Sequence, residues 1–132
     1  MFQLTVRCRL GLYVLVELAR TPSSKQSVVA LGEKLGVSEN HLSKVMQTLA
    51  KARWIVGARG PHGGYQLNLD PSEVSMFDVV ALFEGSPDIE RCSLKDGDSC
   101  SREGNCQVKC VVREIEDHVY EMMREKTLED LT

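Results

Sequence analysis

Ser27 to Leu49 reads SVVALGEKLGVSENHLSKVMQTL, and two groups of apolar residues recur in it at helical spacing. Ser27 and Ser38 each precede one group, where a serine hydroxyl can accept a hydrogen bond from the first turn of a helix. Gly36 lies between the groups and is the residue type that commonly ends a helix. The stretch therefore predicts a short helix over 28–35, a tight turn and a second helix from 39 onward, which is a helix-turn-helix.

The polar face of the second predicted helix is rich in hydrogen-bond donors and carries one acidic residue, Glu39. Such a helix can lie in the major groove of double-stranded DNA, with its first side chains near base edges and its N-terminal amides near phosphate. The alternative is an ordinary solvated helix face. The candidate DNA-binding residues here are Ser38, Asn40, His41, Ser43 and Lys44.

A hairpin with a glycine-rich tip follows the helix-turn-helix. Residues 54–58 and 65–69 predict two short strands, and RGPHGG (59–64) joins them. In this position the hairpin is typical of a wing, from which Arg59 can reach a minor groove and His62 also faces DNA. An ordinary hairpin whose glycines supply positive φ angles is the alternative. The wing after a helix-turn-helix favours DNA binding.

The charge distribution agrees with this interpretation. The chain of 132 residues has a net charge of −3, yet residues 1–69 hold nine Lys/Arg and three Asp/Glu, whereas residues 70–132 hold seven and sixteen. The first half is therefore basic and can meet phosphate, while the second half has another role.

Helices are expected both before and after the helix-turn-helix and its wing. An almost entirely apolar segment over 8–20 predicts a buried first helix, and residues 73–83 predict a helix that packs on the winged unit. Near the C-terminus, a narrow apolar stripe predicts a long helix that pairs with its own copy through residues 105–125. Thr127 and Asp130 predict a capping box for a last short turn. The stripe consists of Val108, Val111, Val112, Ile115, Val119 and Met122.

Four of the five cysteines lie in CSLKDGDSCSREGNCQVKC (92–110). The N-terminal apolar run 10–19 contains Glu17 and resembles neither a signal peptide nor a membrane span, so we expect a cytoplasmic protein with reduced thiols rather than disulfides. Thiolates select zinc or iron-sulphur clusters. Only the interval between Cys106 and Cys110 is as short as those of structural zinc sites, which favours a cluster.

These features together resemble the bacterial Rrf2 family of transcription regulators, over essentially the whole chain. The matching segments are GVS (36–38), HL (41–42), RGPHGGYQL (59–67), the cysteine segment and TLEDL (127–131). The resemblance implies a dimer with an N-terminal winged helix-turn-helix, a long dimerisation helix and, between them, a 2Fe-2S or 4Fe-4S cluster. It also implies that Cys92, Cys100 and Cys106 are cluster ligands.

The fourth ligand departs from the family pattern. Some members use a His three residues after the third cysteine, where this chain has Lys109, and others use an N-terminal acidic residue of the partner subunit, where this chain has Arg9. Cys110 is the first candidate, because it lies at i+4 from Cys106 and roughly 6 Å away between Cβ atoms. Cys8 is the second candidate, although it can equally be a small buried residue of the first helix.

The sequence thus predicts a mainly α protein with a small β wing: a winged helix-turn-helix over 1–84, a cysteine-bearing cluster loop over 85–110, and a dimerisation helix with a final turn over 105–132. The expected function is that of a sequence-specific DNA-binding repressor that senses nitric oxide, iron, redox or cluster status. A zinc-stapled or cluster-free regulator is the alternative, and a thiol redox protein is a third. With three histidines, two of them on the presumed DNA face, the sequence shows no catalytic site.

Overall fold

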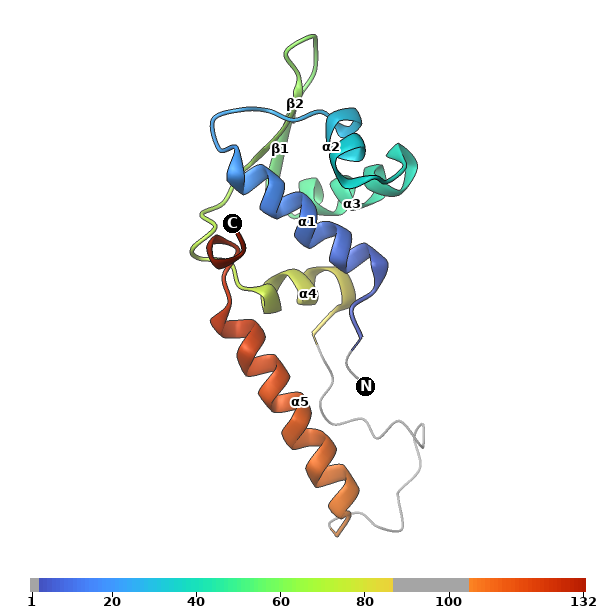
Figure 1. Cartoon of the computed structure of the whole chain (residues 1–132), viewed down its shortest axis with the longest axis vertical. Helices are drawn as coiled ribbons and strands as arrows, with labels where there is room; N and C mark the ends of the chain where they lie inside the picture. The colour runs from blue at the N-terminus through green and yellow to red at the C-terminus, as the bar shows by residue number, and fades with distance from the viewer. Residues whose placement is uncertain (1–2, 87–104) are drawn as a thin grey trace.

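The computed structural model describes residues 3–86 and 105–132, which form mainly helices with one two-stranded sheet (Figure 1). The predicted fold class, a winged helix-turn-helix followed by a long C-terminal helix, is confirmed. In chain order the elements are α1 (Val6–Arg20), α2 (Val28–Leu35), α3 (Glu39–Lys51), β1 (Ile55–Ala58), β2 (Gly64–Leu67), α4 (Met76–Glu84), α5 (Gln107–Glu125) and the 3-10 turn η1 (Glu129–Leu131).

The helix-turn-helix forms as its serines and its glycine predict. The Ser27 hydroxyl accepts a hydrogen bond from the Ala30 N–H at 3.1 Å and begins α2, and the Ser38 hydroxyl accepts one from the His41 N–H at 3.4 Å and begins α3. Gly36 ends α2 with a φ of +66°, a conformation that costs glycine little. The apolar residues of both helices face α1 and form the main core with it.

α1 lies between the helix-turn-helix and α4 (Figure 1). It begins two residues before the predicted Cys8, because the Thr5 hydroxyl accepts a hydrogen bond from the Cys8 N–H at 3.2 Å. Its inner face is fully buried at Val14, Leu15 and Leu18. The approach of α4 to α1 is so close that a Cβ added at Gly11 would lie 2.3 Å from the Phe83 ring.

The predicted start of the fourth helix at Glu73 is wrong, and α4 begins at Met76. A capping box sets this boundary: the Ser75 hydroxyl accepts from the Asp78 N–H, and the Asp78 carboxylate accepts from the Ser75 N–H at 2.8 Å. In addition, Met76 N–H donates to Lys126 O at 2.7 Å and Leu128 N–H donates to Val74 O at 2.9 Å. Residues 74–76 are therefore paired with the C-terminal segment instead of being helical.

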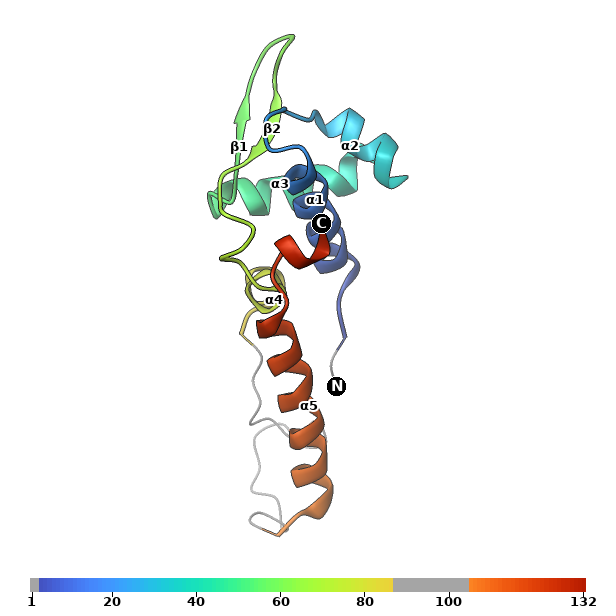
Figure 2. The same cartoon turned by 60° about the vertical axis from the view of Figure 1, so that its left-hand side comes forward.

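The C-terminal half of α5 packs beside α4, and its N-terminal half extends away from the body toward the end of the molecule opposite the wing (Figures 1 and 2). Tyr120 and Met123 are buried in this joint. The Phe77 ring contacts the Tyr120 ring edge-on at 6.0 Å between centroids, and the Arg124 guanidinium lies 4.2 Å above Phe77. Such a cation over an aromatic face adds to the apolar contact.

The predicted capping box at the end of the chain is confirmed. The Asp130 carboxylate accepts from the Thr127 N–H at 2.9 Å and from its hydroxyl at 3.1 Å, and the Thr127 hydroxyl accepts from the Asp130 N–H at 3.4 Å. Among the described residues, no helix is long and apolar enough to cross a membrane.

Candidate DNA-binding surface and cysteine site

The candidate DNA-binding residues of the helix-turn-helix lie on the outer face of α3 or at its N-cap. Asn40, His41 and Lys44 are exposed, as is the cap residue Ser38, and Ser43 is half-buried. The opposite face of α3 is fully buried in the core. The helix is therefore fixed by its apolar side, and it presents its donors to solvent.

Arg7 is a basic residue beside α3 that sequence reasoning missed. Its guanidinium donates to the Thr48 hydroxyl at 3.3 Å, and that hydroxyl donates to Lys44 O at 3.1 Å. Arg7 thus joins the first turn of α1 to the middle of α3. The missed signal was Thr5, whose cap extends α1 far enough to include Arg7.

The wing places Arg59 and His62 at its exposed tip. Strands β1 and β2 pair antiparallel with Ile55 opposite Leu67 and Ala58 opposite Gly64. The tip is a tight turn in which Gly63 N–H donates to Gly60 O at 2.9 Å, and a Cβ at Gly63 would lie 2.4 Å from Ala58 O. Gly63 therefore serves close backbone packing, whereas Gly60 supplies a φ of +110° with open space around it, and the same tip carries the two predicted DNA-facing side chains.

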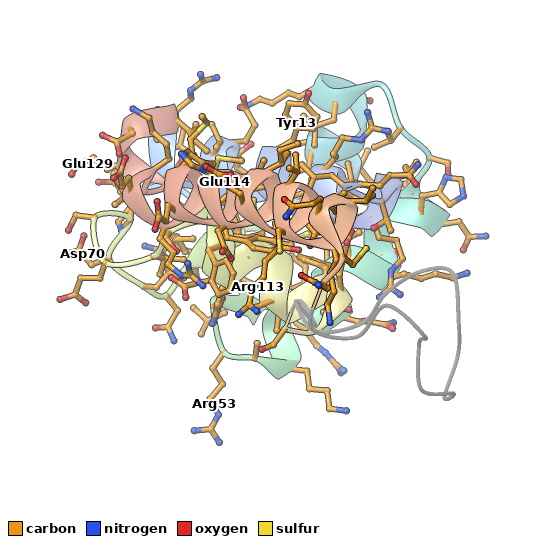
Figure 3. All side chains as sticks on the ribbon, turned by 90° about the horizontal axis from the view of Figure 1, so that it is seen from below. Tyr13, Arg53, Asp70, Arg113, Glu114 and Glu129 are labelled. Carbon is orange, nitrogen blue, oxygen red and sulfur yellow. The ribbon has the colours of Figure 1, made fainter. Side chains whose placement is uncertain are left out.

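Arg53 is an exposed cation in the turn between α3 and the wing. Its side chain projects away from the rest of the molecule (Figure 3), and its backbone has a φ of +62°, which is uncommon for a residue other than glycine. The Asn68 side chain donates to Arg53 O at 2.9 Å and holds this turn. No feature of the sequence predicted a left-handed residue here.

Two of the four predicted metal ligands lie together at the start of α5, whereas Cys92 and Cys100 lie outside the described residues. Cys106 is the N-cap of α5, and its Sγ accepts from the Lys109 N–H at 3.5 Å. Cys110 is exposed one turn further on, and its N–H donates to Cys106 O at 3.1 Å. Thiolates are soft donors of the kind that bind iron-sulphur clusters or zinc. Among the described residues, however, no group of three or more His, Cys, Asp or Glu side chains is placed to hold a metal ion.

Cys8 has a different environment. It is fully buried where α1, α4 and α5 meet, in contact with the cluster formed by Val80, Tyr120 and Met123. Burial, together with the smaller effect of the nearby Glu84 carboxylate, raises the pKa of the Cys8 thiol to about 11. Of the two roles considered for Cys8, the structure supports that of a small apolar core residue.

Comparison with known proteins agrees with this architecture. The family model Rrf2, described as an iron-dependent transcriptional regulator, matches residues 4–132. BadM of Rhodopseudomonas palustris, named as a helix-turn-helix transcriptional regulator, is 33% identical over 121 residues, which cover 92% of this chain and 75% of BadM. NsrR of Shouchella clausii, another regulator of this type, is 29% identical over 130 residues, which cover 98% of this chain and 87% of NsrR.

Among solved structures, CymR, the global cysteine regulator of B. subtilis, superposes with a TM-score of 0.80 and 28% identity over 99% of this chain and 96% of CymR. These relatives are named as transcriptional regulators and not as enzymes, and the exposed face of α3 with the wing beside it remains the predicted DNA-binding surface. The chain therefore belongs to the Rrf2 family of winged helix-turn-helix transcriptional regulators.

Proposed function

We propose that this regulator is a cytoplasmic homodimer that represses transcription by binding operator DNA, under the control of a 2Fe-2S or 4Fe-4S cluster held by residues 85–110. The observation that carries the proposal is the pair of thiols at the start of α5. Cys106 caps the helix and receives the Lys109 N–H, and Cys110 follows one turn later. Hydrogen bonds to ligand sulphurs and a helix N-terminus both stabilise bound thiolate.

The ligands in this proposal are Cys92, Cys100, Cys106 and Cys110. When bound, the cluster supplies a centre that nitric oxide, oxidants or iron shortage can alter. The protein contributes the anionic sulphurs, and Cys106 and Cys110 supply two of them from the start of α5. Lys109 offers only its backbone N–H to this site, because its ammonium has no lone pair with which to bind a metal.

On the DNA side, α3 enters the major groove with Ser38, Asn40, His41, Ser43 and Lys44, while Arg59 and His62 approach the neighbouring minor groove. Lys44 is assigned to phosphate, where it gives affinity that does not depend on sequence. Arg59 is assigned to groove shape, which a guanidinium senses through the stronger negative potential of a narrow groove.

A series of direct contacts joins the C-terminal end of α4 to α3. α4 ends at Glu84, just before that segment, and the Glu84 carboxylate accepts from the Thr5 N–H at 2.7 Å. Two residues later, Arg7 donates to Thr48 of α3. A change in the position of the α4 C-terminus can therefore reach α3 through the first turn of α1.

The dimer in this proposal forms through the apolar stripe of α5. Val108 is 68% exposed and Ile115 is 59% exposed, on a helix whose N-terminal half has no other element against it in the described part of the chain. The stripe is not uniform, since Val119 turns partly toward α4 whereas Met122 stays exposed. A second copy would cover this surface. Residues 1–84 would then bind DNA, residues 85–110 would hold the cluster, and residues 105–132 would form the dimer contact.

A zinc-holding or cluster-free regulator is the second candidate. It is favoured by Lys109, which stands where some relatives have a histidine ligand, and by the likeness to CymR, which is named for cysteine and not for iron. Anaerobic purification followed by iron, sulphide and zinc analysis separates these possibilities. The proposal expects visible absorbance with iron and sulphide, which Cys106→Ala abolishes; a colourless protein with stoichiometric zinc, or with no metal, would contradict it.

A further inference from the structure

In the part of the chain that the structure describes, Gln26 is the one buried residue with a polar or charged side chain beyond the core, and 7% of its surface is exposed. It lies in the connection between α1 and α2, immediately before the Ser27 cap. A buried amide is costly unless its donors and acceptor are all satisfied. The position of Gln26 and its partners therefore need an explanation.

The Gln26 side chain joins the ends of two helices. Its Nε2 donates to Glu17 O at 3.2 Å and to the Thr21 hydroxyl at 2.5 Å, both at the C-terminal end of α1. Its Oε1 accepts from the Lys34 ammonium of α2 at 2.9 Å. The amide nitrogen thus donates two hydrogen bonds and the amide oxygen accepts one. These three hydrogen bonds hold the α1–α2 connection in one place relative to the helix-turn-helix.

The Gln26 backbone joins the same connection to the wing. Its N–H donates to Tyr65 O at 2.9 Å, and Tyr65 N–H donates to Gln26 O at 2.7 Å, so residue 26 extends the sheet beside β2. The contact is so close that a Cβ on Gly64 would lie 2.8 Å from the Gln26 carbonyl carbon and oxygen. Nearby, the Gln66 side chain donates to Pro22 O at 2.8 Å.

We infer that Gln26 is a positioning residue for operator recognition, which orients the wing so that Arg59 and the outer face of α3 reach DNA together. Arg59 and His62 lie at an exposed tip, so their place depends on the base of the hairpin. That base meets the α1–α2 connection at Gln26, whose side chain ties the connection to both helices. The inference rests on the wing's role in the proposed function and adds the residue that sets its orientation.

The test is a double-mutant cycle on DNA binding, with the full-length protein and an operator fragment selected by this protein from a random-sequence pool. Gln26→Met keeps the side-chain length and removes the amide. In the natural chain Arg59→Ala is expected to weaken operator binding about 5- to 150-fold. In the Gln26→Met chain the same change should cost less than about 2-fold, because a displaced wing no longer delivers Arg59 to the groove.

Lys44→Ala is the matched comparison, because α3 is held by its own core and should lose the same factor in both backgrounds. Urea unfolding checks that each variant is folded. Thr21→Val, which removes one acceptor of the Gln26 amide, gives a milder form of the same perturbation if Gln26→Met does not fold. An Arg59→Ala cost that is equal in both backgrounds would overturn the role of Gln26 alone. No cost in the natural chain would overturn the wing's role as well.

Discussion

Replacing Gly64 with alanine tests how the wing is joined to the rest of the winged helix. Gly64 has a φ of +138°, where a residue with a Cβ costs about 1–2 kcal/mol. The new Cβ would also lie 2.8 Å from the Gln26 carbonyl group, so the connection must move. Movement sacrifices the two backbone hydrogen bonds between Gln26 and Tyr65, which together contribute about 1–3 kcal/mol.

Gly60→Ala is the matched control, because Gly60 has a φ of +110° and no atom lies within 4 Å of its added Cβ. Urea unfolding should show a loss of about 1–2 kcal/mol for Gly60→Ala and about 2–5 kcal/mol for Gly64→Ala. In addition, only Gly64→Ala should reduce the hydrogen-exchange protection of the Tyr65 N–H. Equal losses of stability with unchanged protection would mean that contact with Gln26 does not hold the wing.

Three further results are expected. The Cys8→Ala protein should keep its iron and sulphide and lose about 1 kcal/mol of unfolding free energy, whereas the Cys106→Ala protein should lose the metal. Loss of visible absorbance in the Cys8→Ala protein would mean that Cys8 is a cluster ligand. Ile115→Lys should give a folded monomer by mass measurement, because Ile115 is 59% exposed within one chain; a persistent dimer would place the contact elsewhere. The Thr127 N–H and hydroxyl lower the Asp130 pKa below its ordinary 3.8, so their stabilisation is full above about pH 4 and is lost as pH falls through the lowered pKa. Thr127→Val should therefore destabilise the protein at pH 7 and much less in acid, and an equal loss at both pH values would refute this link.

Local signals predicted most of the fold. The serine caps and Gly36 defined α2 and α3, and the apolar residues at helical spacing are those that the core buries. The start of α4 also has a local signal, the capping box of Ser75 with Asp78. However, Pro71 and Ser72 gave a competing helix-start signal three to four residues earlier. Pairing of residues 74–76 with the distant segment 126–128 decided between them, and a linear pattern does not contain that pairing.

The site was predictable where one helix presents it and not where distant segments meet. The outer face of α3 follows from periodicity, because the buried face fixes the exposed one. The pairing of Gln26 with Tyr65 joins residues far apart in the chain, and Gln26 alone looks like an ordinary loop residue. Cys8 shows a related limit, since a thiol on an apolar helix suits a core or a ligand equally well until the neighbouring helices are known.

Titration of one operator fragment by cluster-bearing protein and by protein stripped of its cluster under anaerobic conditions, with mass measured in parallel, decides whether the cysteine segment controls DNA binding. Through the contacts from α4 to α1 and α3, the two forms should differ about 5- to 150-fold in affinity while both remain dimers. A stripped sample that became monomeric would instead assign control to assembly. Indistinguishable binding curves would contradict cluster-controlled repression.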